Sequence, residues 1–291
     1  MTGLGGRAAS PRVAAIPVGA RTAGALALAW LASIVAFCWP LVLRPGHGLE
    51  HGTAAPLVLG GAMVAVIAVV MIALSDGGIE IKALATLGLL TAVGSVLRPL
   101  SAGTAGVELV FVLIILGGRA LGPGFGFALG STTILTSALL TGGVGPWMPF
   151  QMLASSWLGM GAALLPVRVR GRREIALLAA YGAAGALVYG FAMNVTFWPF
   201  QLGGGTGLSY VAGAPVLENL RRLALFTGAT SLGWDAGRAV TTAVGIVVLG
   251  RPVLRLLRRT AARAAFGPAP RTPGPAPEAS STPAPTGAPT A

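Results

Sequence analysis

The stretch PGFGFALGSTTILTSALLTGGVGPWMPFQMLASSWLGMGAALLPV, residues 123–167, decides the fold class of this chain. It holds two long apolar runs, 123–141 and 150–167, separated by the short loop 142–149 (GGVGPWMP). An α-helix needs about 20 apolar residues to cross the hydrocarbon core of a bilayer. Two such runs with a short connection predict neighbouring transmembrane helices.

Runs of the same kind recur on both sides of this stretch. They are 22–43, 57–74, 80–97, 106–119, 174–198 and 223–250. The chain is 54% hydrophobic and only 10% charged, whereas a soluble domain carries roughly a quarter charged residues. The sequence therefore predicts an all-α, polytopic membrane bundle of about seven or eight transmembrane helices. Two of the runs, 80–97 and 106–119, are short and could be partly re-entrant.

Small residues predict how these helices pack. Glycines occur within the apolar runs, as at Gly94, Gly126, Gly130 and Gly159. Such residues let membrane helices approach closely, so we expect close helix packing in the middle of the chain.

Arginine placement predicts the orientation of the bundle. With eight crossings and both ends inside, the inner segments carry Arg7, Arg12, Arg21, Arg119, Arg168, Arg170, Arg172, Arg173, Arg251, Arg255, Arg258, Arg259 and Arg263. The outer segments then carry Arg44, Arg98, Arg221 and Arg222. Short cytoplasmic loops are enriched in basic residues, so we expect a multi-pass protein of the cell membrane with both termini cytoplasmic. Arg221 and Arg222 violate this rule and thereby suggest a special role.

Three segments follow from these patterns. We expect a cytoplasmic N-terminal tail at 1–21, a transmembrane domain at 22–266 and a C-terminal tail at 267–291. The last segment is rich in Pro, Ala, Thr and Ser. It cannot bury a core, so we expect it to be disordered.

Several function classes lack their motifs. The net charge of +12 could suggest nucleic acid, but the arginines cluster between apolar runs, which is typical of membrane topology. The sequence contains no Walker motif, no H-E-x-x-H and no G-x-S-x-G. The lone cysteine, Cys38, offers no disulfide, and His47 and His51 in one glycine-flanked loop are weak evidence for a metal. We therefore expect no metal, no cofactor and no enzymatic activity.

Polar and aromatic residues collect on the predicted outer side. They are Arg98, Glu108, Trp147, Gln151, Asn194, Trp198, Asn219 and Arg221. Aromatic planes supply contact area and a few polar groups orient a ligand, as an external small-molecule site requires. We therefore predict that these residues bind a small molecule, with Arg98 or Arg221 placed for an anionic group.

Each of these residues also allows a structural interpretation. Trp147 and Trp198 could be interfacial anchors, and Gln151 could form an interhelical hydrogen bond. Asp235 and Arg238 lie within the last apolar run at i, i+3 spacing, where they can pair with each other. That pair could lock the bundle or take part in transport.

The middle of the chain resembles a known family. The resemblance is carried by Arg98-Pro99, Gly103 to Glu108, GGRALGPGFGFALG (117–130), SALLTGGVGPWMPFQMLASSWLGMGAALLP (137–166), YGFAMNVTFWPF (189–200) and ENLRRLALFTGATSLGWDAGRA (218–239). These segments resemble substrate-binding subunits (S components) of energy-coupling factor (ECF) transporters, in a branch common in high-GC Gram-positive bacteria. The resemblance covers roughly residues 20–266, and GPWMPFQML (145–153) is its most specific part.

The resemblance implies a fold, a function and a set of partners. The fold would be a compact helical bundle with a six-helix core, and 22–266 would be the substrate-binding domain. The chain would capture a vitamin or related micronutrient, with cobalamin-like compounds among the options. Its partners would be that small molecule, membrane lipid, a transmembrane coupling subunit and two ATPase subunits, without nucleic acid. The alternative is a membrane scaffold or an enzyme acting on a lipid-linked substrate, with Asp235 and Arg238 as catalytic residues.

Overall fold

The computed structural model of the chain describes residues 14–42, 54–75, 78–100, 106–201 and 205–264. Helices dominate these ranges and no strand occurs within them, which confirms the all-α class. The predictions that concern the C-terminal tail 267–291, most of the N-terminal tail and the loop with His47 and His51 lie outside the described residues.

Every apolar run that the sequence predicts contains a helix. The elements are α1 (Ala20–Phe37), α2 (Trp39–Val42), α3 (Ala54–Ser75), α4 (Ile81–Leu100), α5 (Val110–Leu121), α6 (Pro123–Thr141), α7 (Met148–Leu164), α8 (Arg172–Gln201), α9 (Val216–Phe226), the π-helical turn η1 (Thr227–Ser231) and α10 (Leu232–Ala264). The last three are continuous, so the final helix extends beyond the predicted run 223–250 at both ends.

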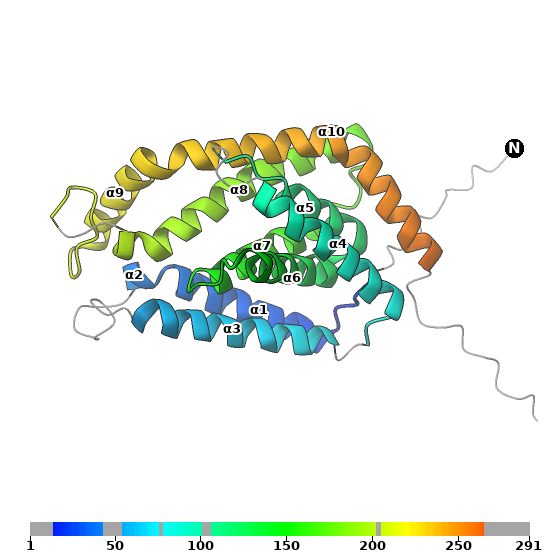
Figure 1. Ribbon diagram of the computed structural model, residues 1–291, viewed down its shortest axis with the longest axis horizontal. Coiled ribbons are helices and arrows are strands. Elements are labelled where there is room, and N and C mark those ends of the chain that lie inside the picture. Colours follow the sequence, from blue (N-terminus) through cyan, green and yellow to red (C-terminus); the bar gives the residue numbers. More distant parts are fainter. Residues whose placement is uncertain (1–13, 43–53, 76–77, 101–105, 202–204, 265–291) are drawn as a thin grey trace, which may run out of the picture.

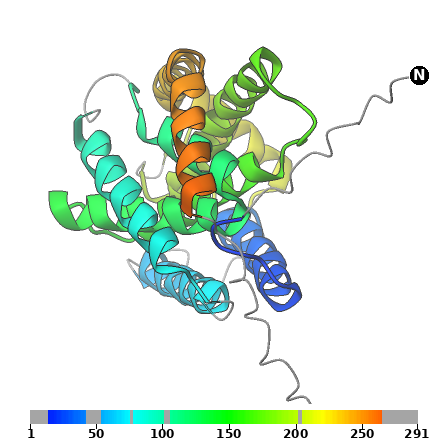
Figure 2. The ribbon, with the colours of Figure 1, turned by 90° about the vertical axis from the view of Figure 1, so that its right-hand side faces the viewer.

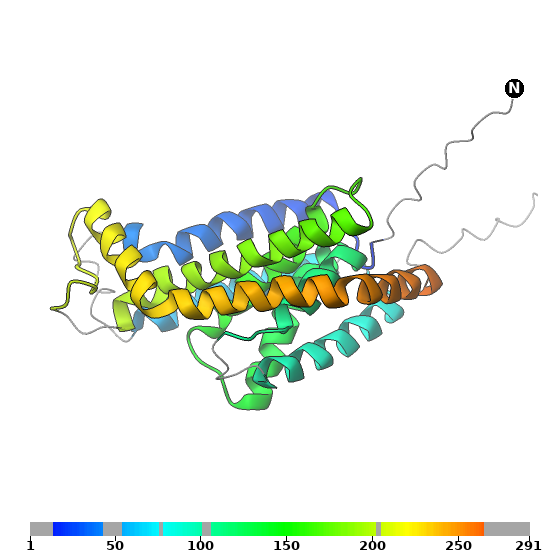
Figure 3. The ribbon, with the colours of Figure 1, turned by 90° about the horizontal axis from the view of Figure 1, so that it is seen from above.

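The α6–α7 hairpin occupies the centre of the bundle. Figure 1 views this hairpin nearly end-on, with α8 and α10 lengthwise on one side and α1 and α3 lengthwise on the other. Figure 2, turned by 90°, shows α6 crossing the bundle. Helix α5 packs against both α7 and α10, which joins the central hairpin to the α8–α10 pair. Figure 3 shows α9 and α10 following one another along the surface of the molecule.

Glycine permits the tight connection between α5 and α6. Gly122 adopts φ 104°, a conformation that L side chains rarely adopt, and its N–H donates to the carbonyl of Gly118. Pro123 then begins α6, where a missing N–H costs nothing because the first helical turn has no partner for it. The chain therefore passes from α5 to α6 in a tight turn at residues 122–124.

Small residues bring α6 and α7 into backbone contact. A side chain at Gly126 or at Gly130 would collide with the backbone of α7, at Gly159 and Ser155 respectively. Ser131 and Ser156 hydrogen-bond to each other across this interface at 2.6 Å. The predicted close approach of glycine-bearing helices is confirmed at these positions.

The helices are suited to a membrane. Five helical stretches of the described part are long and apolar enough to cross a bilayer: 20–37, 81–100, 123–141, 172–199 and 216–263. Many apolar side chains are exposed on the outer faces, including Leu28, Val188 and Val248. The chain is therefore a polytopic helical membrane protein. Helix α5, with 12 residues, is too short for a full crossing, as the short run 106–119 suggested.

One end of the bundle is rich in arginine and contains a buried ionic cluster. Arg119 in the last turn of α5 is buried, and its Nε lies 2.7 Å from Oε1 of Glu174. Its two terminal nitrogens donate to the carbonyls of Leu165 and Pro166. Arg258 of α10 binds the same carboxylate at 2.7 Å. Arg119, which the sequence analysis assigned to an inner connecting segment, belongs to the last turn of α5, where the carboxylate and two carbonyls satisfy its fully enclosed guanidinium.

Candidate functional site

A cavity of about 330 Å³ lies at the other end of the bundle. It is lined by Arg98, Glu108, Gln151, Tyr189, Gly190, Met193, Asn194, Ser231, Trp234, Asp235 and Arg238. These residues come from the C-terminal end of α4, the segment before α5, the first turn of α7, the second half of α8, η1 and the start of α10. Four residues that the sequence predicts for the site, Arg98, Glu108, Gln151 and Asn194, therefore meet in one cavity.

Arg98 is held by a neutral partner. Its Nη2 donates to Oε1 of Gln151 at 2.7 Å, and among the described residues it forms no ion pair. Gln151 thus makes the interhelical hydrogen bond of its structural interpretation. It also lines the cavity, and its contact with a ligand stays a prediction. No described carboxylate is bonded to this guanidinium at the cavity wall.

The other three charges form a closed network. Arg238 lies 2.6 Å from Oε2 of Glu108 through its Nε, and 2.8 Å from Oδ1 of Asp235 through its Nη1. The Arg238 guanidinium also stacks over the ring of Tyr189, 5.2 Å from its centroid. The predicted pairing of Asp235 with Arg238 is confirmed, and Glu108 adds a second carboxylate from 130 residues earlier in the chain.

Two glycines make this network possible. A side chain at Gly190 on α8 would overlap the carboxylate of Asp235. Gly106, with φ 88°, lies against the backbone of α10 at Trp234, and a side chain there would collide with the Trp234 carbonyl. Close backbone approach thus lets both acids reach Arg238.

Asn194 connects α8 to the π-helical turn. Its Nδ2 donates to Oγ1 of Thr227 at 3.3 Å, and its Oδ1 accepts from Oγ of Ser231 at 3.1 Å. Both partners lie in η1. A π-helical turn inside a longer helix is rare and often marks a functional site. Here it brings Ser231 to the cavity wall beside Asn194.

The two predicted tryptophans do not line the cavity. Trp147 precedes Gln151 by one helical turn, is 45% exposed and packs its ring over Gly145. Trp198 is buried, donates its Nε1–H to the carbonyl of Leu208 at 2.6 Å, and packs edge-on against Tyr210. The interfacial interpretation of Trp198 is therefore wrong, because its indole N–H is satisfied inside the protein.

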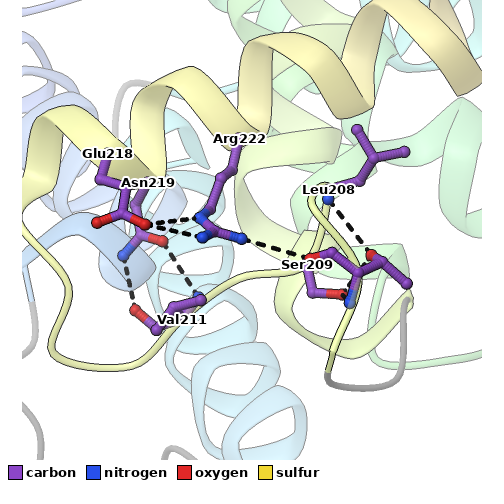
Figure 4. Close-up of polar contacts among 7 residues, drawn as sticks. Leu208, Ser209, Val211, Glu218, Asn219 and Arg222 are labelled. Atoms are coloured by element: carbon purple, nitrogen blue, oxygen red, sulfur yellow. Dashed lines mark hydrogen bonds and ion pairs between the residues drawn. The ribbon is translucent and has the colours of Figure 1, made fainter.

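Asn219 and Arg221 also lie outside the cavity lining. Figure 4 shows the Asn219 amide facing the backbone of Val211, where it accepts from the N–H at 3.1 Å and donates to the carbonyl at 2.9 Å. The neighbouring Arg222 binds Glu218 at 2.8 Å. Arg221 is exposed. Asn219 therefore anchors the segment before α9.

Tyr189, Ser231 and Trp234 are cavity residues that the sequence reasoning missed. A signal for them exists in helical spacing. Tyr189 shares a helix face with Met193, and Ser231, Trp234 and Arg238 follow at i, i+3 and i+7. This spacing marks a face but does not say what the face meets.

The arrangement can hold a small polar molecule. One cation that bonds no described carboxylate, two amides and a hydroxyl offer charge-assisted and neutral hydrogen bonds, while Tyr189 and Trp234 offer aromatic surface. Within the described residues no group of three or more metal-ligating side chains occurs.

Comparison with known proteins gives one match. The family model described as "ECF transporter, substrate-specific component" matches residues 82–249, more than half of the chain. The matched region contains Arg98, Glu108, Gln151 and every other residue that lines the cavity. Searches of the curated proteins and of the solved structures returned no match.

Proposed function

The chain belongs to the substrate-specific components of ECF transporters, and we propose that it binds a compact, water-soluble vitamin or related micronutrient in the cavity beside Arg98. The observation that carries this proposal is the Arg98–Gln151 pair. Its guanidinium faces a cavity while its bonded partner is an uncharged amide. A carboxylate or phosphate of the ligand would give this guanidinium a charged hydrogen-bond partner.

The network around Arg238 supports a positioning role. Because Arg238 is already bound by two carboxylates, it has little capacity left for an anionic ligand. Its function would be to hold Glu108 and Asp235 as hydrogen-bond acceptors for donor groups of the ligand. The site residues we propose are thus Arg98, Glu108, Gln151 and Asn194, with Tyr189 and Trp234 as aromatic contacts.

Cavity size favours a compact ligand. A volume of about 330 Å³ lies at the lower end of the range for small-molecule sites, roughly 300–1,000 Å³. A cobalamin-like corrinoid is several times larger than a simple vitamin and would not fit without opening the bundle. Among vitamin-type ligands, one of modest size with an anionic group suits the lining best.

The distribution of arginines supports an outward-facing cavity. The opposite end of the bundle carries Arg168, Arg170, Arg172 and Arg173, together with the C-terminal end of α10. By the positive-inside rule that end would be cytoplasmic. The cavity would then meet substrate outside the cell, with both termini inside.

Family membership implies the partners. ECF substrate-specific components work with a transmembrane coupling subunit and ATPases. The chain would therefore bind its ligand by itself, and two ATPase subunits acting through the coupling subunit would power release inside the cell. An enzymatic role for Asp235 and Arg238 is less well supported, since both side chains are engaged with each other.

Ligand binding tests the proposal directly. The purified chain would be titrated with a panel of water-soluble vitamins by calorimetry, and Trp234 near the cavity provides a fluorescence readout. We expect one compact anionic vitamin to bind. Arg98→Gln should weaken that binding about 10- to 100-fold, because it removes a charge-assisted hydrogen bond.

Two further variants sharpen this test. Arg221→Gln probes the other arginine that the sequence offered for an anionic group, and we expect it to leave affinity within about twofold because Arg221 lies outside the cavity lining. Arg168→Gln, at the opposite end, is the matched charge control. Failure of every vitamin to bind, or equal losses in all three variants, would refute the proposed site.

A further inference from the structure

The arginine-rich end of the bundle contains a second cavity. It has a volume of about 330 Å³ and lies between the start of α8 and the C-terminal half of α10. Its lining includes Glu174, Ile175, Arg251, Leu254, Arg255 and Arg258, and we name it the arginine pocket. The substrate cavity at the other end shares no residue with it.

The arginine pocket has an excess of positive charge. Glu174 is its acidic residue, and that carboxylate is already bound by both Arg119 and Arg258. Among the described residues neither Arg251 nor Arg255 forms an ion pair. Two guanidinium groups therefore line a cavity without a counterion.

Helix geometry places these cations together. Arg251, Arg255 and Arg258 follow at i, i+4 and i+7 and so share one face of α10. Glu174 fixes the third of them, since Arg258 donates to both of its oxygens at 2.7 and 3.1 Å. Arg258 is therefore fixed at the pocket by Glu174, and the exposed Arg251 and Arg255 share its face of α10.

The surface of α10 shows where this pocket lies relative to a bilayer. Exposed apolar side chains follow one another along the helix up to Leu249, among them Val240, Val244 and Val248. Arginines begin directly afterwards at Arg251. Such a change from exposed apolar to exposed basic residues marks the border between hydrocarbon and headgroups.

The floor of the arginine pocket is apolar. Ile175 and Leu254 are 7% and 3% exposed and line the pocket together with the arginines. A free anion needs only the cations, whereas a lipid brings a phosphate joined to an apolar glycerol and acyl region. We propose that the arginine pocket binds the phosphate headgroup of an anionic phospholipid, with Arg251 and Arg255 contacting the phosphate.

Native mass spectrometry of the full chain tests this proposal. The protein would be released from mixed micelles containing phosphatidylglycerol or phosphatidylcholine, and the lipid retained would be measured. We expect phosphatidylglycerol to be retained and phosphatidylcholine to be lost. Removing both charges in R251Q/R255Q should weaken phosphatidylglycerol binding about 30-fold, since each basic residue near an anionic lipid contributes about 1 kcal/mol, or about fivefold.

A matched control separates a built site from general attraction. R259Q/R263Q removes the same charge from exposed positions of α10 that do not line the pocket, and it should retain the lipid as the parent does. Equal loss in both double variants, or retention in both, would overturn the proposal. The control matters because any basic helix end attracts anionic lipid weakly.

Two other measurements distinguish the alternative ligands. If inorganic phosphate stabilised the protein against heating and phosphatidylglycerol did not, the pocket would bind a free anion and the lipid proposal would be wrong. If R251Q/R255Q lost binding to the coupling subunit while retaining phosphatidylglycerol, the pocket would serve a protein partner, which would also overturn it. Unchanged coupling-subunit binding together with lost lipid would support the proposal.

Discussion

Replacing Glu174 with alanine should destabilise the protein more than any other single change in the arginine-rich end. The Glu174 carboxylate compensates Arg119, whose side chain has no exposed surface. After the change Arg119 would keep only the carbonyls of Leu165 and Pro166. Leaving a buried charge without its partner costs about 3–5 kcal/mol. Arg258 adds little to this cost, because its side chain is 42% exposed and can be solvated.

The expected loss is large enough to measure by heating. For a protein of this size each kcal/mol shifts the unfolding midpoint by roughly 2–4 °C, so Glu174→Ala should lower it by about 10 °C. The assay is the fraction of monodisperse protein that remains in detergent after heating. Glu218→Ala is the matched control, since it breaks an ion pair with Arg222 that is partly exposed. Its effect should be below about 1 kcal/mol.

A double replacement distinguishes an ionic cause from general damage. Arg119→Met together with Glu174→Leu removes both buried charges and keeps similar volume. Such replacements of a buried ion pair are often neutral or stabilising, so the double variant should recover most of the lost midpoint. The reasoning would be refuted if Glu174→Ala cost less than its surface control. A double variant no better than the single would refute it too.

Three more changes test other parts of the structure. Gly190→Ala should displace the carboxylate of Asp235 and weaken ligand binding about tenfold while thermal stability falls little, as calorimetry and heating of one preparation would show. Asn219→Ala should speed hydrogen exchange at the amide of Val211, because that N–H loses its acceptor; an unchanged exchange rate would contradict this role. Gly130→Val should reduce the yield of folded protein severely, since its side chain would enter the backbone of α7.

Hydropathy predicted the helices better than their ends. Helix α5 begins at Val110 rather than at residue 106, because Gly106 adopts φ 88° where it packs against α10. The final helix is longer than its apolar run, since α9 and the end of α10 carry polar residues that hydropathy does not count. The length of an apolar run shows how much of the chain can lie in the hydrocarbon core of a bilayer. The length of the helix depends also on its contacts and on its end caps.

The residues of the cavity beside Arg98 could be predicted only in part, for a similar reason. A sequence shows which polar residues lie near one membrane face, and this was enough for Arg98, Glu108, Gln151 and Asn194. It does not show whether a polar side chain turns toward a cavity or toward its own backbone. Buried polar groups are almost always hydrogen-bonded, and the position of the nearest hydrogen-bond partner decides which way the side chain points.

Asn219 shows how that choice is made. Its amide meets both backbone groups of Val211 only eight residues away. Asn194, in contrast, meets hydroxyls of the π-helical turn 33 and 37 residues away, which lie beside the cavity. Two asparagines near the same end of the bundle thus differ in role because one binds the nearby backbone and the other binds distant side chains beside the cavity. Composition and periodicity do not reveal which partner each amide meets.

The two ends of the bundle use arginine in opposite ways. Beside the cavity lined by Arg98, Arg238 is bonded to two carboxylates and this group carries one net negative charge, so Arg98 brings the four charged residues of the lining to neutrality. At the other end two arginines share a single carboxylate, that of Glu174. Arg251 and Arg255 are two further cations at the same pocket. A site whose charges sum to zero can select a ligand by geometry, because a misplaced anion gains little from its surroundings. A site with several uncompensated charges attracts any anionic surface, which suits attachment to a membrane rather than discrimination among small molecules.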